Sequence, residues 1–136
     1  MSGGLHWASP YVGKPWVPGA QGPDAFNCWG LVRWIQRLHF SRQMPEIPVD
    51  ENDVAAITGG MRTMIKRIGW RRVPTPRDGD IAVMRSATDP LHVGVWLDAD
   101  GGGILHSVRG VGVIFTGLGI MQLCGWLQVE FYRCAR

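Results

Sequence analysis

The chain has 136 residues, of which 46% are hydrophobic and 18% are charged, so a disordered chain is excluded and one domain with one core is expected. The formal net charge of +3 is mild and its basic residues are spread along the chain, which argues against a dedicated nucleic-acid-binding protein. No apolar run reaches the roughly 18 to 20 residues of a membrane helix, and the first residues lack a secretory signal. We therefore expect a protein that is made in the cytoplasm and has no membrane partner.

Residues 1–23 are rich in glycine and proline, which predicts an irregular N-terminal arm before a single domain at residues 24–136. An amphipathic helix follows the arm and extends to about Phe40, because apolar residues recur there at helical spacing. Either Asp24 or Asn27 can serve as the N-cap of this helix. Its apolar positions are Leu31, Val32, Ile35 and Leu38.

A second helical region is predicted to begin at Asp50. Acidic residues at its start and the basic residues Lys66 and Arg67 at its end complement the helix dipole. The pair Gly59-Gly60 is expected to divide this region into two short helices. The helices thus all precede residue 70.

The rest of the chain is typical of short strands, which are rich in β-branched or aromatic residues and bounded by glycine, proline or aspartate. Because no helix-length pattern separates them, they should pair as an antiparallel meander or a barrel-like sheet. The predicted fold class is therefore α+β, with N-terminal helices packed on an antiparallel β-sheet. The predicted strands are 70–73, 80–85, 92–97, 103–109, 111–116 and 126–132.

Cysteine usage points to one candidate nucleophile. The 3 cysteines, Cys28, Cys124 and Cys134, include no CxxC spacing, so free thiols are expected, with no metal site and no cofactor. Cys28 lies at the start of the first predicted helix, on its apolar stripe, and therefore faces the body of the protein. The unpaired N–H groups and the positive dipole end of a helix stabilise a thiolate at such a position. The alternative interpretation is that Cys28 is a small buried hydrophobic residue.

Two histidines in the predicted sheet are candidates for a general base and for a residue that orients it. His92 opens one strand, His106 lies within the next, and residues 98–103 form the hairpin loop between them. If that hairpin has no odd-register bulge, both imidazoles project from one face as diagonal neighbours. Cys28 would then be the nucleophile, His92 the general base and His106 the residue that orients the base.

The other histidines are weaker candidates. His39 lies eleven positions beyond Cys28, about 16 Å along a helix axis, which is too far to share a proton with the thiol. His6 lies in the arm, where an exposed histidine needs no explanation. For His92 itself, the alternative is a hydrogen-bonded histidine with a structural role.

Four segments carry a resemblance to a known family. In chain order they are FNCWGLVRW, RDGDIAVMR, LHVGVWLD and GILHSVRG, and together they resemble the NlpC/P60 peptidases from about Tyr11 to Ser107, in particular the branch encoded by tailed phages and prophages. The resemblance implies a papain-like α+β fold and cleavage of peptidoglycan stem peptides, most often between D-glutamate and a diamino acid. By motif match, Cys28 corresponds to the nucleophile, His92 to the base and His106 to the third residue.

Three positions depart from the pattern of this family. Asn27 replaces the aspartate before the nucleophile, Trp29 replaces the serine after it, and Trp16 replaces the tyrosine of an upstream Pro-Tyr pair. Many members use these positions to hold the free amine of the substrate or to assist at the reacting carbonyl. We therefore expect Trp16, Asn27 and Trp29 to be substrate-binding residues, with a substrate preference that differs from the usual one.

The favoured hypothesis is a cysteine peptidase of a phage tail that opens the cell wall locally, with the peptidoglycan peptide and other phage tail proteins as partners. A virion tail is then the expected location. An amidase with the same catalytic residues is a variant of this hypothesis. The alternative from another class is a catalytically silent tail-tip protein with the same fold. An acyltransferase or thioesterase on a rearranged scaffold would place histidine before cysteine, which is the reverse of the order here.

Overall fold

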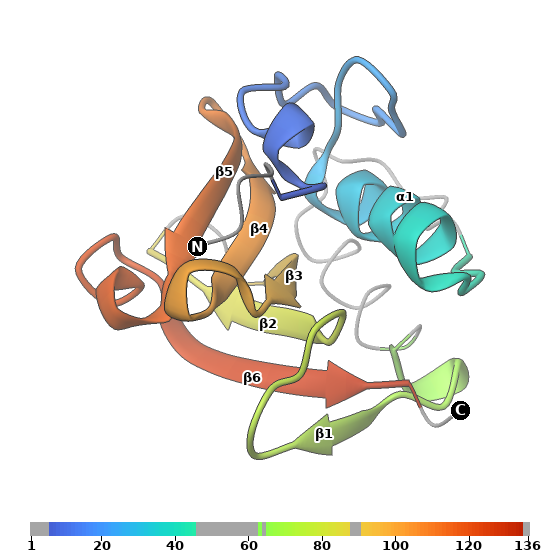
Figure 1. Ribbon diagram of the computed structural model, residues 1–136, viewed down its shortest axis with the longest axis vertical. Helices are drawn as coiled ribbons and strands as arrows, with labels where there is room; N and C mark the ends of the chain where they lie inside the picture. Colours follow the sequence, from blue (N-terminus) through green and yellow to red (C-terminus); the bar gives the residue numbers. More distant parts are fainter. Residues whose placement is uncertain (1–5, 46–62, 64, 88–90, 135–136) are drawn as a thin grey trace.

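The computed structural model describes residues 6–45, 63, 65–87 and 91–134, and it has an α+β fold (Figure 1). A helix of 13 residues, α1 (Cys28–Phe40), lies beside a sheet of 6 antiparallel strands in the order β1-β6-β2-β3-β4-β5. Three short 3-10 helices lie at Ser9–Tyr11, Ala99–Gly101 and Leu118–Ile120. The strands are β1 (Arg71–Val73), β2 (Ile81–Arg85), β3 (His92–Leu97), β4 (Gly103–Val108), β5 (Gly112–Gly117) and β6 (Leu127–Arg133). The predicted fold class is confirmed.

Helix α1 begins where its N-cap satisfies the first turn. The backbone of Asn27 is extended, and its Oδ1 atom accepts a hydrogen bond of 2.6 Å from the N–H of Gly30, so Asn27 is the N-cap rather than Asp24. The helix ends at Phe40, as predicted, because Ser41 adopts a left-handed conformation with φ of 54°. The predicted start of a second helical region at Asp50 lies outside the described residues, whereas residues 65–67 are helical.

All six predicted strands are present, with ends that differ from the predicted ones by at most one residue. Strands β2 to β5 form the expected meander of consecutive neighbours. Strand β6 does not extend it, because it inserts between β1 and β2, where Phe131 pairs with both Val73 and Ala82. The central strand β2 is therefore completed by the segment that comes last in the chain.

The sheet separates two groups of buried side chains. The helix-side core joins α1 to one face of the sheet and includes Leu31, Val32, Ile35, Val93, Val95 and Leu105. The far-side core lies on the opposite face and consists of Ala82, Met84, Trp96, Ile104, Met121, Trp126 and Phe131. Because side chains alternate along a strand, neighbouring residues of β3 and β4 enter different cores.

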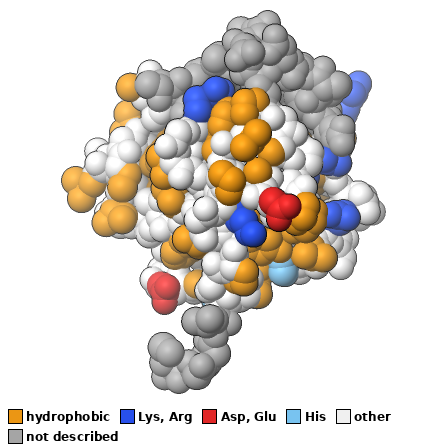
Figure 2. Space-filling view, turned by 90° about the horizontal axis from the view of Figure 1, so that it is seen from above, with side chains coloured by type: hydrophobic (Ala, Val, Ile, Leu, Met, Phe, Trp, Pro, Cys, Tyr) orange, Lys and Arg blue, Asp and Glu red, His pale blue; other side chains and the backbone are white. Residues whose placement is uncertain are grey.

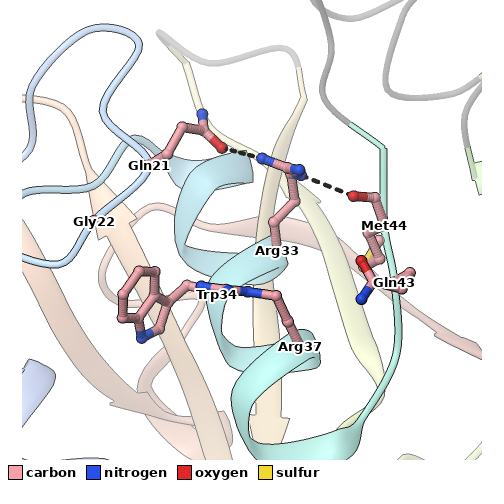
Figure 3. Close-up of a pocket in the computed structure, with 7 residues that line it drawn as sticks. All are labelled: Gln21, Gly22, Arg33, Trp34, Arg37, Gln43 and Met44. Carbon is pink, nitrogen blue, oxygen red and sulfur yellow. Dashed lines mark hydrogen bonds between the residues drawn. The ribbon is translucent and has the colours of Figure 1, made fainter.

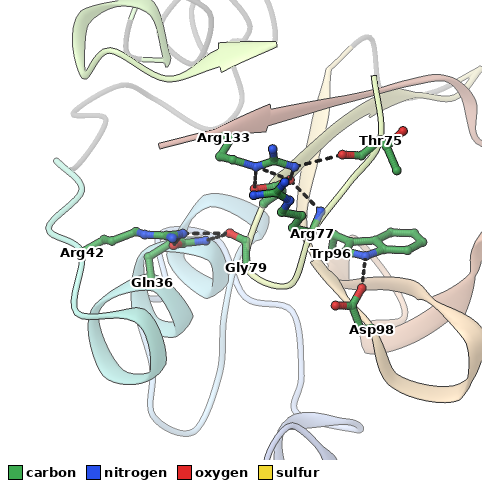
Figure 4. Close-up of polar contacts among 9 residues, drawn as sticks. Gln36, Arg42, Thr75, Arg77, Gly79, Trp96, Asp98 and Arg133 are labelled. Carbon is green, nitrogen blue, oxygen red and sulfur yellow. Dashed lines mark hydrogen bonds and ion pairs between the residues drawn. The ribbon is translucent and has the colours of Figure 1, made fainter. Parts of the chain in front are cut away.

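Polar contacts hold the turn before β2 against both α1 and β6 (Figure 4). Gln36, fully buried on α1, donates a hydrogen bond of 2.8 Å from Nε2 to the carbonyl of Gly79, which also accepts a bond of 3.3 Å from Arg42. Asp80 is 2% exposed and forms an ion pair of 2.8 Å with Arg133 of β6. These bonds satisfy buried polar groups and fix where β2 begins.

The N-terminal arm contacts the outer strand β5. The N–H of Gly13 donates to the carbonyl of Val113 at 2.9 Å, and the N–H of Val113 donates to the carbonyl of Lys14 at 2.9 Å. A Cβ atom on Gly112 would lie 2.6 Å from that same Lys14 oxygen, so the close approach of the arm requires glycine there. The arm is thereby joined to the sheet.

The surface mixes apolar and basic side chains, as Figure 2 shows for the face seen from above. The exposed large hydrophobic residues are Val12, Val17, Leu38, Val111, Leu118, Ile120, Leu123 and Leu127. Half of them, Leu118, Ile120, Leu123 and Leu127, lie in the segment that leads into β6, and the others come from separate parts of the chain. Among the described residues, no helix has the length and apolar character needed to cross a membrane.

Candidate active site

The two histidines of the sheet lie in direct contact. Strands β3 and β4 pair without a bulge, with Trp96 opposite Ile104, so His106 lies one diagonal step from His92. The Nε2 atom of His92 and the Nδ1 atom of His106 are 2.8 Å apart and form a hydrogen bond. The arrangement of the imidazoles expected from the sequence is present.

Gly94 allows the two strands to approach each other at this point. A Cβ atom there would lie 2.6 Å from Ile104 Cγ2, 2.8 Å from the carbonyl oxygen of Leu105 and 2.9 Å from the Cβ of His106. None of these distances leaves room for a side chain. Glycine is therefore required at this position for steric reasons, because a side chain on Gly94 would keep β4 and His106 away from His92.

Trp126 covers the histidine pair. Its ring stacks on His92 with centroids 4.4 Å apart and an interplanar angle of 20°, and it meets His106 edge-on at 5.4 Å. His92 is 4% exposed, His106 is 0% exposed and Trp126 is 6% exposed. No sequence motif indicated Trp126, because its contact with the histidines arises only when β6 inserts beside β2.

Burial keeps both imidazoles neutral. Desolvation lowers the pKa of His92 well below its ordinary value, and the neighbouring His106 lowers this pKa further. Desolvation also lowers the pKa of His106 to about 4. A neutral imidazole can accept a proton, which is the state that a general base requires. Because Nε2 of His92 is bonded to His106, Nδ1 is the nitrogen that can take a proton from a thiol.

Thr116 of β5 contacts the other nitrogen of His106. Its Oγ1 atom lies 2.9 Å from His106 Nε2, and its side chain is 3% exposed. The register of β4 and β5 places Thr116 opposite Ile104, one diagonal step from His106. Thr116 was not predicted as a site residue, although the register of the second hairpin places it on the same face as His106.

Cys28 is the first residue of α1, partly buried against the helix-side core. The turn before it is tied to β4, because the hydroxyl of Ser107 donates a hydrogen bond of 2.7 Å to the carbonyl of Phe26. Ser107 follows His106 directly, so this bond links the start of α1 to the strand that carries a histidine. The structure thus joins His92 and His106 directly, and the bond of Ser107 ties the start of α1 to β4.

A family comparison bears on these residues. The model of the NlpC/P60 family matches residues 13–119, more than half of the chain, and this range includes Cys28, His92 and His106. The chain belongs to the NlpC/P60 family. Members of the family are generally cysteine peptidases or hydrolases that act on peptidoglycan peptides. No curated protein matches the chain.

The three positions that depart from the NlpC/P60 pattern have different surroundings. Asn27 is 9% exposed and caps α1, and Trp29 is 4% exposed and donates its indole N–H to the carbonyl of Pro45 at 2.9 Å. The apolar face of Trp29 is therefore turned into the core. Trp16 is partly exposed, and the guanidinium of Arg109 lies over its ring at 4.4 Å. Capping and packing account for Asn27 and Trp29, and their roles toward a substrate stay predictions.

The two weaker histidine candidates take part in packing between the arm and α1. His39 stacks on Trp7 with ring centroids 3.9 Å apart, and its Nε2 atom lies 2.9 Å from the hydroxyl of Tyr11. His6 accepts a hydrogen bond of 3.1 Å from the N–H of Ala8. Both contacts lie on the helix side of the sheet, away from Trp126.

A pocket of about 360 Å³ lies along α1 (Figure 3). Its lining residues are Gln21, Gly22, Arg33, Trp34, Arg37, Gln43 and Met44. Within it, Arg33 donates to the side-chain oxygen of Gln21 at 2.6 Å and to the carbonyl of Met44 at 2.8 Å. The pocket contains no residue of the histidine pair, and the described residues hold no cluster of three side chains suited to a metal ion.

Proposed function

We propose that this protein is a cysteine peptidase that hydrolyses peptidoglycan stem peptides, with Cys28 as nucleophile, His92 as general base and His106 as the residue that orients the base. The observation that carries the proposal is the buried hydrogen bond of 2.8 Å between His92 Nε2 and His106 Nδ1. It leaves Nδ1 of His92 for the thiol. Membership of the NlpC/P60 family supports the same assignment.

The proposed reaction has two steps. In the first, His92 Nδ1 takes the proton of the Cys28 thiol, the sulfur attacks the carbonyl carbon of the scissile amide, and the imidazolium returns the proton to the leaving amine. A thioester and a free amine result. In the second, His92 takes a proton from water, the hydroxide attacks the thioester carbonyl, and the C–S bond breaks. The imidazolium then returns its proton to the Cys28 sulfur, and a carboxylic acid leaves. The N-terminal end of α1 favours the negative charge that develops beside Cys28 in both steps.

The finer identity of the substrate rests on the sequence. We propose cleavage between D-glutamate and a diamino acid in stem peptides that are still joined to glycan. Asn27 lacks the carboxylate that would pair with a free substrate amine, which supports this preference. Trp16 is the most accessible of the three departing residues, so it is the one best suited to stack on a substrate.

The proposed setting is a phage tail, with other tail proteins as partners and the virion as location. A second candidate function is a structural tail protein that keeps the fold without activity. The burial of His92, which lowers its pKa and makes it a weaker base, favours this second candidate.

Digestion of purified muropeptides followed by mass spectrometry separates the two functions. The wild-type protein and Cys28→Ala are incubated with the same muropeptides, and each product mass identifies the broken bond. Products of a D-glutamyl bond from the wild type alone support the proposal. A different product set would name another bond, such as that of an amidase, and an unchanged digest would favour the structural tail protein.

A further inference from the structure

Both ring nitrogens of His106 are engaged. Nδ1 lies 2.8 Å from His92 Nε2, and Nε2 lies 2.9 Å from Thr116 Oγ1. The three side chains come from the neighbouring strands β3, β4 and β5, and each is displaced by one diagonal step from the next. They form a chain of hydrogen bonds that ends at a hydroxyl group.

The protons of this chain can be arranged in two ways, because a neutral imidazole has one N–H and one bare nitrogen. In the first, His92 donates from Nε2 to His106, and His106 donates from Nε2 to Thr116. In the second, Thr116 donates to His106, and His106 donates from Nδ1 to His92. The second arrangement puts the proton of His92 on Nδ1, where it blocks transfer from a thiol. Only the first arrangement makes His92 a base toward Cys28.

Few groups around His106 could replace the hydroxyl of Thr116 as an acceptor. Thr116 is 3% exposed, His106 is 0% exposed, and Trp126 covers the histidine pair at 6% exposure. A buried N–H without an acceptor is costly, so His106 can keep its proton on Nε2 only while an oxygen faces that nitrogen. The described residue that supplies such an oxygen is Thr116.

We propose that Thr116 is a positioning residue, which accepts the Nε2 proton of His106 and thereby holds the bare Nδ1 of His106 toward His92. This inference rests on the proposed function in one respect, since the value of the arrangement lies in the role of His92 as base. Thr116 touches neither the substrate nor the thiol. It acts through His106 by supplying the acceptor that the Nε2–H form of His106 requires.

The direct test is imidazole ¹⁵N NMR at neutral pH, which identifies the protonated nitrogen of each histidine and requires no substrate. The wild type should show Nε2–H forms for both His92 and His106. Thr116→Val, which removes the acceptor, should shift His106 toward the Nδ1–H form, and Thr116→Ser should restore the wild-type forms. An Nδ1–H form of His106 in the wild type would overturn the proposal even if the valine variant failed to fold. Unchanged forms in a folded valine variant would also overturn it.

Kinetics supply the second test. Thr116→Val should lower kcat by about 10- to 100-fold, the range found when a partner that orients a functional histidine is removed, with little change in KM. Thr116→Ser should recover most of the lost rate. Thr75→Val is the matched control, because Thr75 is exposed and lies outside the hydrogen-bond chain. If the wild type proves inactive, the proposed function fails, whereas the NMR result still decides the role of Thr116.

Discussion

The nucleophile is the residue on which the proposed function depends most. Cys28 is partly buried at the start of α1, whereas Cys124 is exposed. If exposure alone controlled reactivity, Cys124 would react first with an alkylating agent. A thiolate favoured by the helix N-terminus would reverse that order, because the thiolate is the reactive form.

We expect Cys28→Ala to abolish hydrolysis and to change the free energy of unfolding by less than about 1 kcal/mol, since a small group is lost at a helix end. Iodoacetamide near neutral pH should modify Cys28 before Cys124 and Cys134, as followed by peptide mass spectrometry. Faster modification of Cys124 would contradict an activated thiol at Cys28.

The two histidines should respond differently to substitution. His92→Ala should remove activity, because it removes the group that is proposed to take the thiol proton. His106→Asn should retain part of it, since the amide oxygen can accept from His92 and the amide nitrogen can donate to Thr116. The measurement is kcat for each variant. Equal and complete loss of kcat in both variants would require the two roles to be reassigned, and full activity of His92→Ala would disprove the mechanism.

The buried imidazoles also make stability depend on pH. The folded state lowers the pKa of His106 from 6.5 to about 4, so its contribution is complete above pH 6.5 and is lost as the pH falls toward 4. As the pH falls, His106 binds a proton in the unfolded chain before it does so in the folded chain. This lowers the free energy of unfolding by about 3 kcal/mol. Urea unfolding at pH 7.5 and pH 4.5 should show the loss. His106→Asn should weaken the dependence, and a wild type equally stable at both values would disprove it.

At the scale of elements, the approach of β3 and β4 determines whether the histidines meet. Gly94→Ala would place a Cβ atom 2.8 Å from the carbonyl oxygen of Leu105, a backbone atom that can move only with its strand. We expect a loss of about 1–3 kcal/mol in the free energy of unfolding, with reduced activity. Gly119→Ala is the matched control, because no atom lies within 4 Å of its added Cβ. Equal denaturation midpoints for both variants would show that the strands tolerate separation.

Local sequence patterns predicted where the helix and the strands lie better than they predicted which strands pair. Helical spacing predicted the last residue of α1, and turn residues predicted the position of every strand. In each case the residues that form the signal lie within a few positions of one another in the sequence. The insertion of β6 was not predictable from such signals. It depends on pairs such as Arg85 with Leu127, which are distant in sequence. Trp126 was missed for the same reason, whereas His92 and His106 were predicted because one short hairpin joins them.

At the scale of the whole molecule, we expect residues around the start of α1 to influence the size of the preferred substrate. Asn27→Asp would keep the N-cap, because aspartate caps helices as well as asparagine, and would restore a carboxylate next to the nucleophile. The wild type should have a kcat/KM on a muramyl-linked peptide at least as high as that on the free tetrapeptide. Asn27→Asp should shift the ratio toward the free amine.

The comparison uses the same peptide with and without its muramyl group. A strong preference of the wild type for the free peptide, unchanged in Asn27→Asp, would show that recognition lies away from Trp16, Asn27 and Trp29. In that case the pocket lined by Arg33 and Arg37 becomes the next region to mutate.

The place of β6 between β1 and β2 has a consequence for synthesis of the chain. A ribosome releases β2 through β5 first, so the nascent sheet has an open edge on β2 and its two imidazoles lack the cover of Trp126. The long separation between paired strands makes this closure a slow, late event in folding. A peptidase of the kind proposed would therefore gain its finished catalytic centre only after residue 133 has left the exit tunnel, and unfinished chains would pose little danger to the cell that makes them.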